Sequence, residues 1–276
     1  MLPMDIVFGT DADLMATSTI DCLRRLLLAG VVAAVVACPP CETWSAARWR
    51  APRKPPPLRS AEHPWGMPGL APEHLKQLTV ANKLMAHTLS LVATALVRGA
   101  PVIMEQPRAR SEHYMASIWR TAQLQHLRRI APHADEVHFL QGDLGQASPK
   151  PTTFFTAGVA EMRAALRRHQ VEPALRPGPL VPDEHDRLPT AKLKAFPAGL
   201  NAAIADAVAS CLPQRRPCAC GAPWAADLDR IGRLWQSAAA ATESEMGPDY
   251  VRGGGKESIL ATMRADARSG RSPPLL

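Results

Sequence analysis

Short apolar runs alternate along this chain with longer stretches in which apolar residues recur every three or four positions. Short β-branched runs predict buried strands, and the longer period predicts helices. The run from Val31 to Ala37 is of the first kind, and it ends abruptly at two prolines. We expect strands near Ile6 and at 31–37, 102–104, 137–140 and 152–155, with helices at 17–29, 72–98, 111–130, 160–169 and from 198 onward.

This alternation predicts an α/β fold with an open, mostly parallel sheet flanked by helices. Open sheets of this class bind ligands at the carboxyl ends of their strands. Pro39 and Pro40 hold a stiff turn at such an end, which makes the thiol of Cys41 the first candidate for chemistry. Glu105 ends the run at 102–104 in the same way and is followed by Pro107.

The overall charge narrows the choice of partner. The chain has 276 residues and a formal net charge of +7, which favours an anionic partner such as nucleic acid; a basic protein without such a partner is the alternative. Its six cysteines are too few for a disulfide framework and indicate a reducing, intracellular compartment, of which the nucleus is one. No signal peptide is expected, and no apolar run is long enough to predict a membrane span.

Basic residues and tryptophans are interleaved directly after the two prolines. No acidic residue lies between Glu42 and Glu62, and Trp44, Trp49 and Trp65 belong to the same stretch. Such a segment can lie along a phosphate backbone, although a solvated proline-rich loop has the same composition. The candidate nucleic-acid contacts are Arg48, Arg50, Arg53, Lys54 and Arg59.

The nucleophile loop carries a resemblance. Pro39, Pro40 and Cys41, followed by Glu42 and a short aromatic and serine segment up to Ser45, resemble the loop of DNA cytosine methyltransferases that modify ring carbon five. That family usually has Gln where this chain has Glu42. A later family strand ends in Glu-Asn-Val, and Glu105-Gln106-Pro107 occupies the corresponding place here.

The resemblance implies roles for particular residues. Cys41 would be the nucleophile, and Glu105 would hold the ring nitrogen and amino group of the target cytosine. Asp11 matches the aspartate that contacts the adenine of S-adenosylmethionine, and Lys150 matches a basic motif. The implied partner is DNA, with RNA as the alternative, and the implied fold is a Rossmann-like methyltransferase domain over 1–212. Residues 213–276 are expected to form a partly disordered extension.

One family element is missing from this sequence. The Phe-x-Gly-x-Gly loop that cradles the cofactor has no counterpart before Asp5. We therefore expect either an N-terminally truncated enzyme or one module of a longer polypeptide with an upstream part. The alternative function is an inactive remnant, or a nucleic-acid-binding module of the same fold.

Two further interpretations concern Cys38 and Cys41, which form a Cys-x-x-Cys pair. Thioredoxin-like redox chemistry requires a helix that starts at the second cysteine, because the helix N-terminus lowers the thiol pKa. A zinc site would recruit Cys218 and Cys220, but the Cys-x-Cys spacing is unusual and no histidine lies close by. No metal site is expected.

The last expectation is geometric. If the strands at 31–37 and 102–104 are parallel neighbours, Cys41 and Glu105 lie at the same edge of the sheet and face one site about as wide as a base. The alternative is that Cys41 is a buried apolar residue and Glu105 a solvated strand end.

Overall fold

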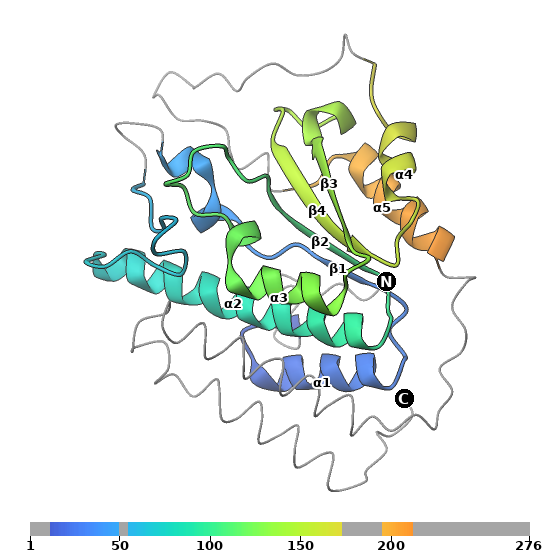
Figure 1. Ribbon diagram of the computed structural model, residues 1–276, viewed down its shortest axis with the longest axis horizontal. Helices are drawn as coiled ribbons and strands as arrows, with labels where there is room; N and C mark the ends of the chain where they lie inside the picture. Colours follow the sequence, from blue (N-terminus) through green and yellow to red (C-terminus); the bar gives the residue numbers. More distant parts are fainter. Residues whose placement is uncertain (1–11, 50–54, 173–194, 212–276) are drawn as a thin grey trace, which may run out of the picture.

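The computed structural model describes residues 12–49, 55–172 and 195–211 (Figure 1). In this part of the chain, five α-helices flank a four-stranded sheet. The strands are β1 (Val35–Ala37), β2 (Val102–Pro107), β3 (Asp135–Leu140) and β4 (Pro151–Ala157). The helices are α1 (Thr17–Leu28), α2 (Pro72–Val97), α3 (Ala122–Ile130), α4 (Met162–Arg168) and α5 (Ala198–Cys211).

The sheet is mixed, which corrects the expectation of a mostly parallel one. Its strand order is β1-β2-β4-β3. β1 and β2 are parallel, with Val35 opposite Val102 and Ala37 opposite Met104. β4 is antiparallel to both of its neighbours, β2 and β3. β1, β2 and β3 therefore point in one direction and β4 in the other.

The start of β1 and the end of β2 differ from the expected strand bounds. β1 begins only at Val35, and Val31 is 67% exposed, because the ladder starts where β2 starts. β2 continues past Met104, since β4 pairs with it as far as Pro107, which lies opposite Thr152. Pro107 is tolerated there because a terminal position needs no further N–H donor.

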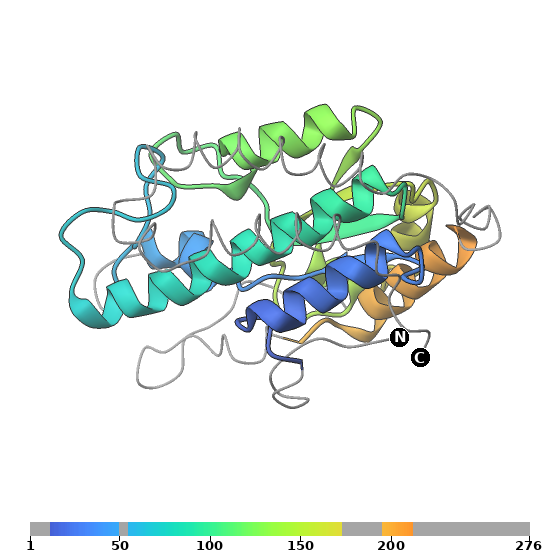
Figure 2. The ribbon, with the colours of Figure 1, turned by 90° about the horizontal axis from the view of Figure 1, so that it is seen from below.

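Each face of the sheet carries its own hydrophobic core. One core combines Val102 and Met104 of β2 with residues of α1, α2 and α3. The other combines Ile103 with residues of α4 and α5. Alternate residues of a strand point to opposite faces, so neighbours on β2 belong to different cores. Figures 1 and 2 show α1, α2 and α3 lying side by side, and Figure 1 shows α4 and α5 on the other side of the strands.

The expected helix at 111–130 is shorter in the structure. α3 begins only at Ala122, where the hydroxyl of Thr121 accepts a hydrogen bond from the Leu124 amide. The preceding segment is a loop that ends in a short 3-10 helix, Ile118–Arg120, and a β-bridge between Met115 and Ser60 holds the loop. Such tertiary contacts outweigh the helix propensity of residues 111–121.

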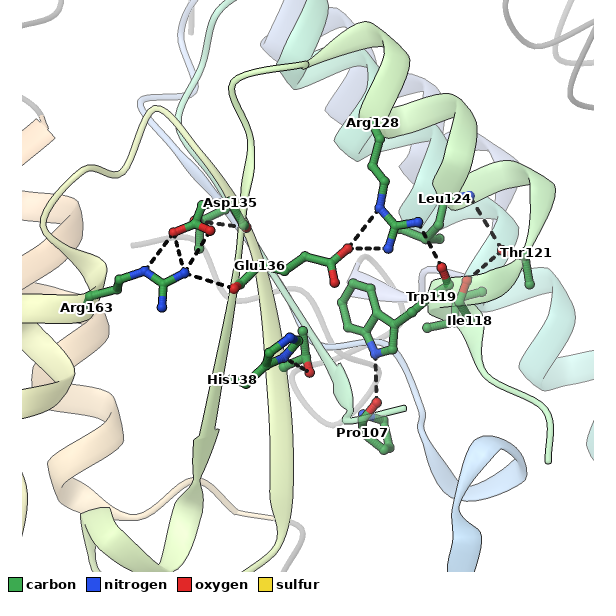
Figure 3. Close-up of polar contacts among 12 residues, drawn as sticks. Pro107, Ile118, Trp119, Thr121, Leu124, Arg128, Asp135, Glu136, His138 and Arg163 are labelled. Carbon is green, nitrogen blue, oxygen red and sulfur yellow. Dashed lines mark hydrogen bonds and ion pairs between the residues drawn. The ribbon is translucent and has the colours of Figure 1, made fainter. Parts of the chain in front are cut away.

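β3 forms one edge of the sheet, and charged side chains line it (Figure 3). Arg163 of α4 donates two hydrogen bonds of 2.8 Å to Asp135, and Arg128 of α3 pairs with Glu136. Charges on an edge strand oppose pairing with a further strand. The other edge is β1, where Val36 is 41% exposed.

α2 is long and apolar enough to cross a membrane by length and composition. Most of its apolar window is buried inside the fold, as expected for a core helix, so this is weak evidence for a span. The expected strand near Ile6 and the expected extension at 213–276 lie outside the described residues.

Candidate functional site

The direction of the strands brings distant residues to one edge of the sheet. β1, β2 and β3 all end there, and β4 begins there. The residues at or just beyond these strand ends are mostly polar. We call this group the polar edge, and it consists of Cys38, Cys41, Glu105, Gln141, Lys150 and Thr152.

The pleat places Glu105 on the α4/α5 face. Ile103 belongs to the core on that face, and Glu105 follows it by two residues. Its antiparallel partner is Phe154, which belongs to the same core. Thr152 precedes Phe154 by two residues and shares the face as well. Glu105 is 3% exposed, and Thr152 and Gln141 are fully buried.

Glu105 sits among hydrogen-bond donors. The Gln141 amide nitrogen donates to Glu105 Oε1 over 3.3 Å and to the Thr152 hydroxyl over 3.1 Å. Lys150 Nζ lies 3.9 Å from the same carboxyl oxygen, Oε1. Burial raises the pKa of Glu105, and the positive charge of Lys150 opposes that shift. The side chain is therefore a buried acid that favours its neutral form more than an exposed glutamate does.

The charge of Glu105 affects the pKa of both thiols in the Cys-x-x-Cys pair. Burial, then the charge of Glu105, raises the pKa of Cys38 to about 12 and that of Cys41 to about 11. Lys150 opposes the shift at both cysteines. Cys38 keeps solvent-exposed surface and Cys41 is half-buried, so each is open on one side while protein surrounds it on the others. The thiols and the Glu105 carboxylate thus lie close enough to interact electrostatically.

The turn between the two cysteines is fastened to the next strand. The side-chain amide of Gln106 donates a 2.7 Å hydrogen bond to the carbonyl of Pro39. Gln106 is fully buried and directly follows Glu105 on β2. The turn that carries Cys41 and the strand that carries Glu105 are therefore held together by a buried contact, beyond the last paired residues of β1.

Two arginines hold the segment that follows Cys41. Arg59 is 1% exposed and donates from both Nε and Nη2 to the Thr43 hydroxyl, at 3.0 and 2.9 Å. Its guanidinium lies 4.0 Å from the ring centroid of Trp44 and donates to the Pro64 carbonyl. Arg48 donates to the carbonyl of Glu42 and to the side chain of Gln77 on α2.

These contacts change the expected nucleic-acid interface. Arg59 is buried and its donors bind protein groups, which argues against its expected role as a surface contact with phosphate. Arg48 is half-buried and its donors bind protein groups. The remaining members of the basic segment, Arg50, Arg53 and Lys54, lie outside the described residues, as does Asp11.

The other expected residues of the nucleophile loop surround Cys41. Pro40 and Glu42 are exposed, whereas Pro39 is buried. The hydroxyl of Ser45 accepts a 3.2 Å hydrogen bond from the Ala47 amide, so it shapes the loop. Lys150 reaches Glu105, and its Nζ lies 5.7 Å from the ring centroid of Phe196.

Sequence reasoning missed Gln141 and Thr152. Each stands at a strand end, directly after β3 and near the start of β4, which is the signal that identified Glu105. In the sequence Gln106 is a departure from the family pattern, whereas in the structure it holds the turn through the Pro39 carbonyl. Cys38 enters the sequence analysis as a redox or zinc partner, whereas in the structure it belongs to the polar edge.

The redox and metal interpretations gain no support. Only a three-residue 3-10 helix, Glu42–Trp44, follows Cys41, and both thiol pKa values are raised, whereas redox thiols have lowered ones. The described residues contain no group of three or more His, Cys, Asp or Glu side chains able to hold a metal ion. Cys218 and Cys220 lie outside them.

Comparison with models of protein families, with curated proteins and with solved structures finds no match for this chain.

Proposed function

We propose that this chain is a DNA cytosine methyltransferase-like domain in which Cys41 adds to ring carbon six of a flipped-out cytosine. One observation carries the proposal: the Pro-Pro-Cys turn of Cys41 is held by a buried 2.7 Å hydrogen bond, from Gln106 to the Pro39 carbonyl, against the strand end that carries the buried Glu105, 64 positions further along the sequence (105 − 41). A nucleophile beside an acid is what addition to a pyrimidine ring requires.

In the proposed reaction, Cys41 loses its proton to solvent and the sulfur forms a bond to carbon six. Glu105 gives a proton to the ring nitrogen, which lets electron density reach carbon five. Its raised pKa suits this role, because the neutral acid is the form that donates. After carbon five has taken up a methyl group, a base removes the proton from that carbon, the thiolate leaves, and the ring nitrogen returns its proton to the Glu105 carboxylate.

The methyl donor named by the proposal is S-adenosylmethionine, which supplies an electrophilic methyl group. The described residues do not complete a site for it, because they contain no Phe-x-Gly-x-Gly loop and exclude Asp11. The roles given above are therefore those of this chain's own residues, Cys41 and Glu105.

The test is methyl transfer by the full chain. Incubation with labelled S-adenosylmethionine and cytosine-containing DNA is expected to label the DNA, and Cys41→Ser is expected to abolish labelling, because the hydroxyl is a far weaker nucleophile than the thiolate. Cys22→Ser is the matched control, since Cys22 is exposed on α1. Label transfer that survives Cys41→Ser contradicts the assigned mechanism.

A non-enzymatic nucleic-acid-binding module is the second candidate function. The observation that favours it is the pKa of Cys41, which at about 11 leaves little thiolate at neutral pH. Calorimetry with S-adenosylmethionine separates the two candidates, because binding of the cofactor by this chain alone argues against a module without enzymatic activity.

Either function predicts salt-dependent binding to nucleic acid. We expect the triple replacement of Arg50, Arg53 and Lys54 by alanine to reduce the slope of log affinity against log salt by up to about 2.7, if each cation contacts one phosphate. Fluorescence anisotropy with a labelled duplex measures this slope. The charge-matched control replaces Arg163, Arg167 and Arg168, which lie on α4 beyond the other end of β4. Equal slopes for the wild type and the first variant contradict the prediction.

A further inference from the structure

A chain of hydrogen bonds fixes the orientation of the Gln141 amide. The Thr152 hydroxyl donates its one hydrogen to the Lys150 carbonyl over 3.0 Å. The Thr152 oxygen can then only accept, and the group that reaches it is Gln141 Nε2, at 3.1 Å. The amide nitrogen therefore points toward Thr152 and Glu105, and the amide oxygen points away from them.

This orientation makes the two oxygens of Glu105 unequal. Oε1 accepts from Gln141 Nε2 and lies 3.9 Å from Lys150 Nζ. Neither of these two contacts involves Oε2. A proton on Oε1 would face these N–H groups, so the neutral acid carries its proton on Oε2. The oxygen that can donate is thus not the one that accepts from Gln141.

We propose that Gln141 is a positioning residue, which turns Glu105 so that Oε1 binds inside the protein and Oε2 presents a proton to an acceptor ring nitrogen of the substrate. The inference rests on the proposed function. In the step it describes, the O–H bond at Oε2 breaks and an N–H bond forms at the ring nitrogen as the Cys41 sulfur adds to the ring. Glu105 is left as a carboxylate, which Gln141 and Lys150 stabilise at Oε1.

The amide of Gln141 is not explained by packing alone. The side chain is fully buried, and its oxygen, Oε1, has no hydrogen-bond partner among the described residues. A buried acceptor without a partner destabilises a fold. At the position of this oxygen, an apolar side chain of similar length would therefore be at least as favourable as glutamine. What an apolar side chain lacks is the N–H group that reaches Glu105 and Thr152.

The test compares Gln141→Met with Gln146→Met in the full chain. Gln146 is a buried glutamine of the same loop, but its amide donates to the Ala195 carbonyl instead of Glu105. Infrared difference spectra across a pH titration report the C=O stretch of protonated Glu105, and the Glu105→Gln variant assigns the band. Gln141→Met is expected to move this band to higher wavenumber and to raise the midpoint of the titration, because Oε1 loses a donor that favours the charged form. Gln146→Met should change neither.

Activity is a separate readout. Methyl transfer by Gln141→Met is expected to fall by about a hundredfold if Glu105 is turned away from its productive geometry. A band that moves supports the inference whether or not the wild type transfers methyl groups, whereas loss of the proposed function shows as an inactive wild type. An unmoved band and midpoint overturn the inference even if the wild type is active. Should Gln141→Met fail to fold, Thr152→Val removes the anchor of the amide and is expected to move the band in the same direction.

Discussion

Cys41 is expected to react with iodoacetamide about tenfold more slowly at pH 7 than a cysteine of ordinary pKa. Its pKa of about 11, against 9.0 for an unperturbed thiol, leaves about a hundredfold less thiolate at neutral pH. The more basic thiolate is intrinsically more nucleophilic by almost tenfold, which offsets part of the loss. Because the thiol loses its proton only near pH 11, the rate should rise about tenfold per pH unit until then. Mass spectrometry of the peptide that contains Cys41 measures the rate.

Two variants test the cause of the slow reaction, and they should act in opposite directions. In the alkaline range where Cys41 titrates, Glu105 is ionised, and Glu105→Gln removes a negative charge that raises the pKa of Cys41, so alkylation should become faster there. Lys150→Met removes a positive charge that lowers this pKa, so alkylation should become slower. A rate for the wild type that levels off near pH 9, or two variants that shift in the same direction, contradicts the arrangement of charges at the polar edge.

The parallel pair at the centre of the site was predictable from the sequence. The chain between 31–37 and 102–104 is long and contains the helix α2, which is what a crossover between parallel strands requires. The expectation that these strands are parallel neighbours is confirmed. The expected shared site of Cys41 and Glu105 at one edge of the sheet depends on that pairing, because nothing local links two positions so far apart.

The antiparallel direction of β4 departs from the expected mostly parallel sheet, although the sequence held a signal for it. Only residues 141–150 connect β3 to β4. A parallel crossover needs a dozen residues or more, so this connection favours an antiparallel arrangement. The antiparallel strand matters for the site, because it brings its first residues to the edge where the other three strands end. For this reason Lys150 reaches Glu105, and Thr152 reaches the Gln141 amide that donates to Glu105.

The role of Arg59 could not be read from charge. A basic residue in a proline-rich segment is usually exposed, and the spacing of Trp44 and Trp65 around it resembles that of a nucleic-acid-binding loop. In the structure, the two indole rings lie edge to face, with centroids 5.6 Å apart, and the guanidinium lies 4.0 Å from the Trp44 centroid. The aromatic residues thus bury the cation within the protein. A segment rich in basic and aromatic residues can therefore pack inside a protein as well as bind nucleic acid.

Arg59→Leu is expected to lower the free energy of unfolding by about 3 kcal/mol, a large effect for a residue of a basic segment. The substitution removes both donors to the Thr43 hydroxyl and the donor to the Pro64 carbonyl, and it leaves these groups without that partner in a buried place. Leucine retains part of the apolar contact with Trp44, so the loss is mainly polar. Denaturation by urea, followed by tryptophan fluorescence, measures the change.

Arg48→Leu is the matched control for this prediction. Arg48 also donates to protein groups, but it is half-buried and water can replace its contacts, so its loss should cost about 1 kcal/mol or less. The variant Arg59→Lys tests whether the positive charge alone is sufficient. A lysine keeps the charge but cannot reach both Thr43 and Pro64 with one planar group, so it should recover little of the stability. If Arg59→Leu is as stable as the wild type, the guanidinium does not hold the segment after Cys41. If it instead lowers nucleic-acid affinity without any loss of stability, Arg59 is a surface contact after all.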